Sequence, residues 1–317
     1  KNVDVAILII AENQFGQYEL ELIREFEKFS TPYIILHNKN DISKIESQTK
    51  IIIQSYSKAE IIDFCAKNQK DVAELISNLK KIIPENLYQK TSLLGGLVLS
   101  KDIVLLITPI DDAAPEGRLI LPQNQTIRDA LDNNCITIVL KETEIEDFLR
   151  LNIKPALVIT DSQVFGYVAK RIPENIPLTS FSIIFARMKG DFNAYLRGTT
   201  HISRLKDNDE ILILESCTHH ASCDDIGRVK IPNMLQKFTG KKLSFIVVSG
   251  LSAIPPKNYS LVIQCGGCMV TRNQLINRLK QFTDNKIPIT NYGMALAYMN
   301  GIFERATQVF YQLSFGR

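Results

Sequence analysis

Leu261-Val262-Ile263-Gln264-Cys265-Gly266-Gly267-Cys268 decides the fold of this chain, together with an earlier stretch of similar layout, Ile211-Leu212-Ile213-Leu214-Glu215-Ser216-Cys217-Thr218-His219. Each stretch opens with a short apolar run rich in β-branched residues, which is typical of a buried strand. Parallel strands end at the same edge of a sheet, and open α/β sheets bind their ligands there. If both strands belong to one sheet, we expect Cys217, Cys265 and Cys268 to meet at that edge.

Thiols gathered in this way indicate a metal site. Four of the six cysteines fall between residues 217 and 268, and clustered cysteines in a cytosolic protein are more often metal ligands or catalytic groups than disulfides. Three thiolates with one further ligand suit either zinc or an iron–sulfur cluster. Cys217, His219, Cys265 and Cys268 could form a closed zinc site. A cluster with one exchangeable position is favoured because the chain offers more candidate fourth ligands than a closed site needs. These candidates are His219, His220, Cys223 and Asp224.

Length and composition are those of an ordinary globular protein. The 317 residues suffice for two or three domains, and a net charge of +3 neither favours nor excludes nucleic acid, so no nucleic-acid partner is predicted. No apolar run approaches the ~20 residues that span a bilayer, and there is no signal peptide. We therefore expect a cytoplasmic protein without a membrane partner. The chain begins at Lys1 and enters a strand at Val3, from which we expect that an N-terminal portion is missing.

Alternating strand and helix patterns predict an α/β fold in three parts. In residues 1–85 we expect strands at 3–10, 32–36 and 51–54, and helices at 18–29 and 72–83. In residues 92–195 we expect strands at 103–107, 136–140 and 156–159 and a helix at 181–197. That middle part carries no catalytic constellation, which favours a dimerisation role. A boundary is expected at Gly198-Thr199-Thr200. In residues 199–317 we expect strands at 211–214, 245–248, 261–263 and 288–290.

In residues 1–85, the second expected strand leads into Asn38-Lys39-Asn40-Asp41, which resembles the guanine-recognition motif of GTPases. A carboxylate at Asp41 can accept from both N–H groups of guanine, while Asn38 and Lys39 brace the loop; a plain polar turn is the alternative. Ser55 opens a loose match to the next GTPase loop. The phosphate-binding pattern G-x-x-x-x-G-K-S/T does not occur in the sequence. We therefore expect recognition of the GTP base without hydrolysis.

Taken together, these motifs make the whole chain resemble HydF, the GTPase family that matures FeFe-hydrogenase. The resemblance rests on Cys217-Thr218-His219, on Cys265-Gly266-Gly267-Cys268, and on the stretch from Asp224 to Arg228. It implies a GTPase domain, a dimerisation domain and a cluster domain, with a 4Fe–4S cluster on Cys217, Cys265 and Cys268. It also implies a homodimeric scaffold that works with two radical-enzyme maturases and delivers a diiron precursor to apo-FeFe-hydrogenase.

The chain departs from the family pattern at one cluster position, where Gln264 stands in place of a histidine. The fourth ligand therefore stays open between His219 and the exchangeable carboxylate of Asp224. Two other functions stay open as well: a protein with a structural zinc site that binds a nucleotide and a partner, and an enzyme that uses the cluster for electron transfer.

Overall fold

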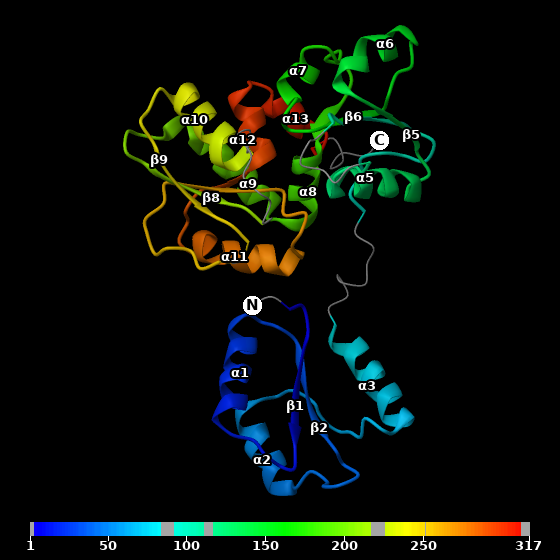
Figure 1. The fold of residues 1–317 in the computed structure, drawn as a ribbon, viewed down its shortest axis with the longest axis vertical. Helices are drawn as coiled ribbons and strands as arrows, with labels where there is room; N and C mark the ends of the chain where they lie inside the picture. Colours follow the sequence, from blue (N-terminus) through cyan, green and yellow to red (C-terminus); the bar gives the residue numbers. More distant parts are fainter. Residues whose placement is uncertain (1–2, 84–91, 111–116, 217–225, 251, 312–317) are drawn as a thin grey trace. The chain divides into compact units, whose positions relative to one another are not determined.

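The computed structural model describes residues 3–83, 92–110, 117–216, 226–250 and 252–311. Two compact units divide the chain, Lys1–Lys90 and Thr91–Arg317. All strand pairs in its three sheets are parallel, which confirms the predicted α/β class (Figure 1). Within the described ranges, no helix has both the length and the apolar character needed to cross a bilayer.

The first unit is a three-stranded sheet in the order β1-β2-β3 with helices on both faces. Successive residues of β2 alternate between the faces. Ile35 packs with Ile23 and Ile53 beneath two helices, while Ile34 packs on the opposite face beneath Leu79 of the third. The elements are β1 (Ala6–Ala11), α1 (Gln17–Lys28), β2 (Tyr33–Asn38), α2 (Ser47–Tyr56), β3 (Ile61–Asp63) and α3 (Gln69–Ile82).

The strand expected at residues 51–54 is wrong, because this segment lies within helix α2. Ile53 is fully buried, whereas Ile51 is 66% and Ile52 43% exposed. Only one residue of the β-branched run therefore faces the core, as on a helix surface. Short apolar runs fit a strand and a buried helix equally well by pattern. The third strand is Ile61–Asp63, which pairs with β2.

The second unit opens with a four-stranded sheet in the order β5-β4-β6-β7. The strands predicted at residues 103–107, 136–140 and 156–159 are present, and the structure adds the short strand β7, which the sequence pattern did not predict. The elements are β4 (Ile103–Ile107), α5 (Leu121–Asp132), β5 (Ile136–Leu140), the 3₁₀ turn η1 (Glu142–Glu144), α6 (Ile145–Arg150), β6 (Leu157–Thr160), α7 (Phe165–Ala169) and β7 (Leu178–Ser180).

The single helix expected at residues 181–197 is wrong, because two helices occupy this region. Helix α8 (Phe181–Lys189) ends at Gly190, and the carboxylate of Asp191 caps α9 (Phe192–Thr199) by accepting from the Ala194 amide at 2.9 Å. The expected boundary at residues 198–200 falls at the end of α9, where the 3₁₀ turn η2 (Thr200–Arg204) follows. There Gly198 lies so close to Ile289 that a β-carbon would come within 1.9 Å of its carbonyl oxygen.

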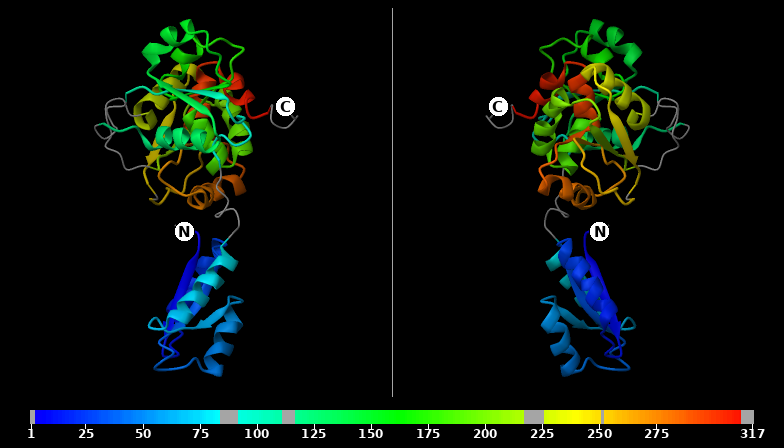
Figure 2. Two further views of the ribbon diagram at one scale, coloured as in Figure 1. Left: turned by 90° about the vertical axis from the view of Figure 1, so that its right-hand side faces the viewer. Right: turned by 90° about the vertical axis from the view of Figure 1, so that its left-hand side faces the viewer.

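The second sheet of this unit has the order β11-β10-β8-β9. Its two faces are covered by different helices: Ile211 and Ile263 pack with Leu235 of α10, while Leu212 shares a core with Leu275 of α11 (Figures 1 and 2). The elements are β8 (Glu210–Leu214), the π turn η3 (Ile226–Lys230), α10 (Ile231–Thr239), β9 (Ser244–Val248), β10 (Leu261–Gln264), α11 (Arg272–Asp284), β11 (Ile289–Asn291), α12 (Tyr292–Met299) and α13 (Phe303–Gln308).

One hydrophobic core joins the two sheets of the second unit. It runs from Leu93 to Phe310 and includes buried strand residues of both, such as Leu105 and Val262. The last helix also contacts α7, which follows β6, because the guanidinium of Arg305 donates to the carbonyl of Ala169 at 2.9 Å. The two sheets thus fold as parts of one body.

Candidate metal centre and guanine-recognition loop

Strands β8 and β10 are parallel neighbours, with Leu214 opposite Gln264, as the sequence predicts. Cys265 continues β10, and its amide donates to the Leu214 carbonyl at 2.9 Å. On the β8 side, the amide of Ser216 donates to Cys265 Sγ at 3.0 Å. Cys217 is the next residue and lies outside the described ranges. Ser216, the residue before Cys217, therefore contacts the Cys265 sulfur.

The Cys265 sulfur is held by N–H groups. Besides the Ser216 amide, the side-chain amide of Gln264 donates to it at 3.3 Å. Burial raises the pKa of the Cys265 thiol, and hydrogen bonds from Ser216 and the Gly267 amide act in the opposite direction. N–H donors to sulfur support thiolate ligands, and a bound metal ion displaces the thiol proton. The surroundings of Cys265 therefore suit a metal-bound thiolate.

The loop from Cys265 to Cys268 turns sharply and leads into a helix. Gly267 has a φ of +66°, a conformation that residues with a side chain rarely adopt. Thr271 then caps α11, since its hydroxyl accepts from the Gln274 amide at 3.3 Å. Helix α11 thus starts shortly after the two cysteines. Its N-terminal dipole carries partial positive charge, which favours anionic thiolates nearby.

Two cations fix the backbone around the thiols. The ammonium of Lys189, at the end of α8, donates to the carbonyls of Gly267 at 2.9 Å, Cys268 at 3.1 Å and Val270 at 2.9 Å. The guanidinium of Arg278 donates to the carbonyl of Glu215, two residues before Cys217, at 2.9 Å. No sequence pattern pairs residues so far apart in the chain, so neither contact was predicted.

The remaining predicted ligands, His219 and Asp224, lie outside the described residues, as do His220 and Cys223. Within the part of the chain that the structure describes, no three His, Cys, Asp or Glu side chains are grouped closely enough to hold a metal ion. Gln264 is fully buried and donates to the Ser216 hydroxyl at 3.0 Å. It therefore helps to hold Ser216, whose amide contacts the Cys265 sulfur. The two cysteines outside residues 217–268, Cys65 and Cys135, are both buried.

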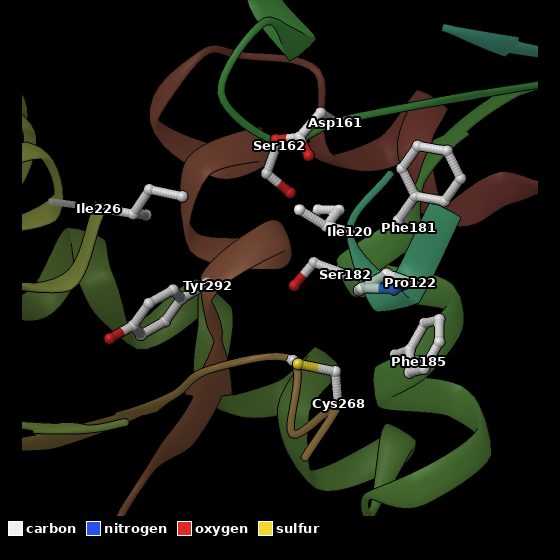
Figure 3. Close-up of a pocket in the computed structure, with 11 residues that line it drawn as sticks. Ile120, Pro122, Asp161, Ser162, Phe181, Ser182, Phe185, Ile226, Cys268 and Tyr292 are labelled. Carbon is white, nitrogen blue, oxygen red and sulfur yellow. The ribbon is translucent and has the colours of Figure 1, made fainter. Parts of the chain in front are cut away.

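A cavity of about 140 Å³ adjoins the loop of residues 265–268, called the thiol loop below. It lies on the side of the β5-β4-β6-β7 sheet of the same unit. Figure 3 shows Cys268 at one end, Asp161 and Ser162 at the other, and Ser182 between them. The rest of the lining is largely apolar: Ile120, Pro122, Phe181, Phe185, Ile226, Gly266 and Tyr292. One of the predicted ligands thus faces a space that a small molecule could enter.

In the first unit, the predicted guanine-recognition residues begin with Asn38, the last residue of β2, and continue into the loop after it. Lys39 has a φ of +63°, and its ammonium lies 3.4 Å from a carboxylate oxygen of Glu12. The Oδ1 atom of Asn38 is buried and has no hydrogen-bond partner among the described residues. The structure thus brings Asn38, Lys39 and Asp41 together in one loop at the carboxyl edge of the sheet, where α/β folds place ligands.

The end of β3 completes this loop. The amide of Asn40 donates to the Phe64 carbonyl at 3.1 Å, and the Lys67 ammonium lies 3.3 Å from Asp41 Oδ2. The Cys65 thiol and the Lys67 ammonium hold the pKa of the Asp41 carboxyl below its usual value. The loop therefore presents an ionised carboxylate between two strand ends.

Ser55 does not follow a strand, so the reason for placing it with Asp41 is wrong. Its hydroxyl donates to the Ile52 carbonyl within α2, at 2.6 Å. It lines a pocket with Tyr33, at the amino end of β2, whereas Asp41 follows the carboxyl end. The segment that follows the third strand is Cys65-Ala66-Lys67. The sequence signal for this segment is its Ser-Ala-Lys-like pattern shortly after the apolar pair Ile61-Ile62.

Comparison with known proteins assigns the second unit. Residues 93–190 match the family model described as the hydrogen maturase F dimerization domain, and residues 193–309 match the hydrogen maturase F tetramerization domain. The comparison with curated proteins finds no match. The two family models together cover more than half of the chain and support a role in hydrogenase maturation. This chain belongs to the hydrogen maturase F (HydF) family.

Proposed function

We propose that this chain is a scaffold or carrier in FeFe-hydrogenase maturation. It holds a 4Fe–4S cluster on Cys217, Cys265 and Cys268, leaves one iron with an exchangeable ligand, and passes a diiron precursor to the apo-hydrogenase. One observation carries the proposal: the Cys265 sulfur lies at the carboxyl edge of a parallel sheet and accepts from the amide of Ser216, the residue before Cys217.

The residues present fit such a cluster. Thiolates are its usual ligands, and hydrogen bonds to sulfur together with nearby charge tune it. Here the N–H donors of Ser216 and Gln264 meet one sulfur, and the cations Lys189 and Arg278 bind the backbone on either side. When bound, the cluster supplies an iron whose ligand can be replaced. The Gln264 side chain donates to Ser216 through Nε2. The proposed exchangeable ligand is Asp224 or His219.

The same proposal includes guanine recognition by residues 1–85. Asp41 accepts from the two N–H groups of the base, and Asn38 and Lys39 brace the loop. The Lys67 contact and the lowered pKa of Asp41 support this role, because recognition needs the carboxylate ionised. Since the sequence has no phosphate-binding pattern, this chain is proposed to recognise GTP without hydrolysing it.

Residues 92–195 and 199–317 are proposed as the dimerisation and cluster domains. The two matched family models are a dimerization and a tetramerization domain, which supports self-association of this chain. The proposed partners are a second copy of the chain, the two radical-enzyme maturases and the apo-FeFe-hydrogenase.

The test is metal and sulfide analysis of anaerobically purified protein, with electron paramagnetic resonance after reduction. We expect iron and sulfide in near-equal amounts, and a reduced-cluster signal that shifts when an external ligand is added. Cys265→Ser should remove the iron, whereas Cys135→Ser, which changes a buried thiol elsewhere, should retain it. Zinc without sulfide, or normal iron content in Cys265→Ser, would overturn the proposal.

A further inference from the structure

The second unit also contains a larger opening, a cleft of about 810 Å³. The cavity beside Cys268 measures about 140 Å³ by comparison. Clefts of roughly 300–1,000 Å³ are of the size that holds small organic ligands. Among the residues that the structure describes, the lining includes no predicted metal ligand and no predicted guanine-recognition residue. The proposed function therefore gives this cleft no role.

Helices α7, α10, α12 and α13 surround the cleft. Helix α12 contacts each of the other three (Figure 1), and all four contribute to the lining. Part of the wall is apolar and comes from α10 and α12, through Met234, Leu296 and Met299. Methionine side chains are flexible and polarizable, so they adapt to bodies of different shape. A ligand with an apolar body therefore has a surface to pack against.

The charged side chains of the lining are mainly basic. Lys170, Arg171, Lys230 and Arg305 line the cleft, and Glu174 is the acidic residue among its described lining. The whole chain of 317 residues has a net charge of only +3, so this cleft concentrates positive charge. A cleft lined by one sign of charge focuses the field and raises the local concentration of ligands of the opposite sign. The lining therefore favours anions.

Arg305 fixes the basic part of the wall. Its guanidinium donates to the carbonyls of Ala169 at 2.9 Å, Ile172 at 2.9 Å and Pro173 at 2.7 Å. These bonds join α13 to the end of α7 and the turn after it, next to Lys170 in the chain. Carbonyl groups orient a cation but carry no net charge, so they do not neutralise it. The wall is therefore both positioned and positively charged before a ligand binds.

Arg171 and Tyr167 form a flat surface in the same cleft. The guanidinium carbon of Arg171 lies 3.4 Å from the centroid of the Tyr167 ring, and both residues belong to the lining. A guanidinium is a planar donor group that matches carboxylate and phosphate oxygens. Its ion pair with Glu146 is long, at 3.7 Å, and the Glu146 side chain is 68% exposed. Exposed pairs of this kind contribute little, so an anion in the cleft can compete for Arg171.

We propose that this cleft binds an organic anion with an apolar body. Lys170 and Arg171 attract the acidic group, which is a carboxylate, sulfonate or phosphate. The body packs against Met234 and Met299. Lys170 is exposed and has no ion-pair partner among the described residues, so its charge is available to the ligand. The site uses neither the cluster nor the guanine-recognition loop.

The test compares three probes by titration calorimetry on the full chain. Naphthalene-2-sulfonate carries both proposed features, naphthalene-2-sulfonamide has the same ring without the charge, and methanesulfonate has the charge without the ring. We expect naphthalene-2-sulfonate to bind with a Kd of about 1 mM or tighter, as its size allows. The sulfonamide should bind at least about tenfold more weakly, because it loses the charge-assisted contacts. Methanesulfonate should also bind at least about tenfold more weakly, because it buries almost no apolar area.

Two variants locate the binding. Lys170→Met should weaken naphthalene-2-sulfonate binding by about tenfold, since it removes one charged partner of the acidic group. Lys154→Met is the matched control, because Lys154 is an exposed lysine that does not line the cleft. Met299→Glu places a carboxylate on the apolar wall and should abolish binding of the sulfonate.

Several outcomes would overturn the proposal. Equal affinity for the sulfonate and the sulfonamide would show that the cations take no part. Unchanged affinity in Lys170→Met, or an equal loss in Lys154→Met, would show that the probe binds elsewhere. Absence of saturable binding by naphthalene-2-sulfonate would refute the site outright. If Met299→Glu fails to fold, the three probes and Lys170→Met decide. Iron and sulfide content does not enter these measurements, so failure of the scaffold function and failure of this proposal are distinguishable.

Discussion

Lys189 fastens the thiol loop, and we expect Lys189→Met to loosen that loop selectively. Its ammonium donates to three carbonyls, those of Gly267, Cys268 and Val270, at 2.9, 3.1 and 2.9 Å. A hydrogen bond to a charged group contributes about 1.5–3 kcal/mol. The three bonds share one ammonium, and the partly exposed carbonyls of this loop can regain water. We therefore expect a loss of about 2–3 kcal/mol in the local opening free energy, below the simple sum.

The assay is amide hydrogen exchange measured by mass spectrometry on the metal-free protein. The loop can open without global unfolding, and exchange reports that local free energy. A loss of about 2–3 kcal/mol corresponds to roughly 30- to 150-fold faster exchange in peptides covering residues 265–271. Lys280→Met is the control, since Lys280 is an exposed lysine of α11. If Lys189→Met exchanges within about threefold of the unaltered chain in these peptides, the ammonium does not hold the loop.

Three further predictions concern the other sites. Asp41→Asn should weaken GDP binding about 10- to 100-fold by calorimetry, with Asp147→Asn unchanged. Because the pKa of Asp41 is lowered, its carboxylate stays ionised as pH falls, so GDP binding should persist through the ordinary aspartate range near about pH 4; a midpoint above that range would contradict the assignment. Asp224→Ala should keep the iron and sulfide content but shift the reduced-cluster resonance. Asp225→Ala, the control, should change neither the content nor the resonance. Loss of the cluster in Asp224→Ala would show that Asp224 is a firm ligand. Gly198→Ala would place a β-carbon 1.9 Å from the Ile289 carbonyl and should cost about 3 kcal/mol or more, seen as a lower Tm, while Gly266→Ala, at an ordinary 3.7 Å from Ser182, should be near neutral.

The arrangement of β8 and β10 could be predicted because two simple rules suffice for it. An apolar β-branched run predicts a buried strand, and parallel strands share a carboxyl edge. Those rules placed Cys265 beside the end of the 211–214 strand, where Ser216 now contacts it. The rules say nothing of Lys189 or Arg278, because their partners are backbone carbonyls with no sequence signature.

The errors have equally specific causes. Ile51-Ile52-Ile53 looks like a strand, but tertiary packing uses only Ile53 and keeps the segment helical. Because of that single error, the third strand was expected at residues 51–54 instead of Ile61–Asp63. Ser55 was therefore chosen in place of Cys65-Ala66-Lys67, the segment that follows the actual third strand. The break between α8 and α9 depends on Gly190 and the Asp191 cap, which a long apolar helical pattern conceals.

The shared core of the second unit has a mechanical consequence for the cavity beside Cys268. Buried side chains of both sheets pack in one cluster from Leu93 to Phe310, so the described residues on both sides of the cavity belong to one packed body. A small molecule that bound in this cavity would find a preformed pocket, and binding would not require closure of two parts of the protein. Preorganised pockets of this kind spend little binding free energy on ordering the protein. Differences in affinity among guests should then arise mainly from how fast each one leaves.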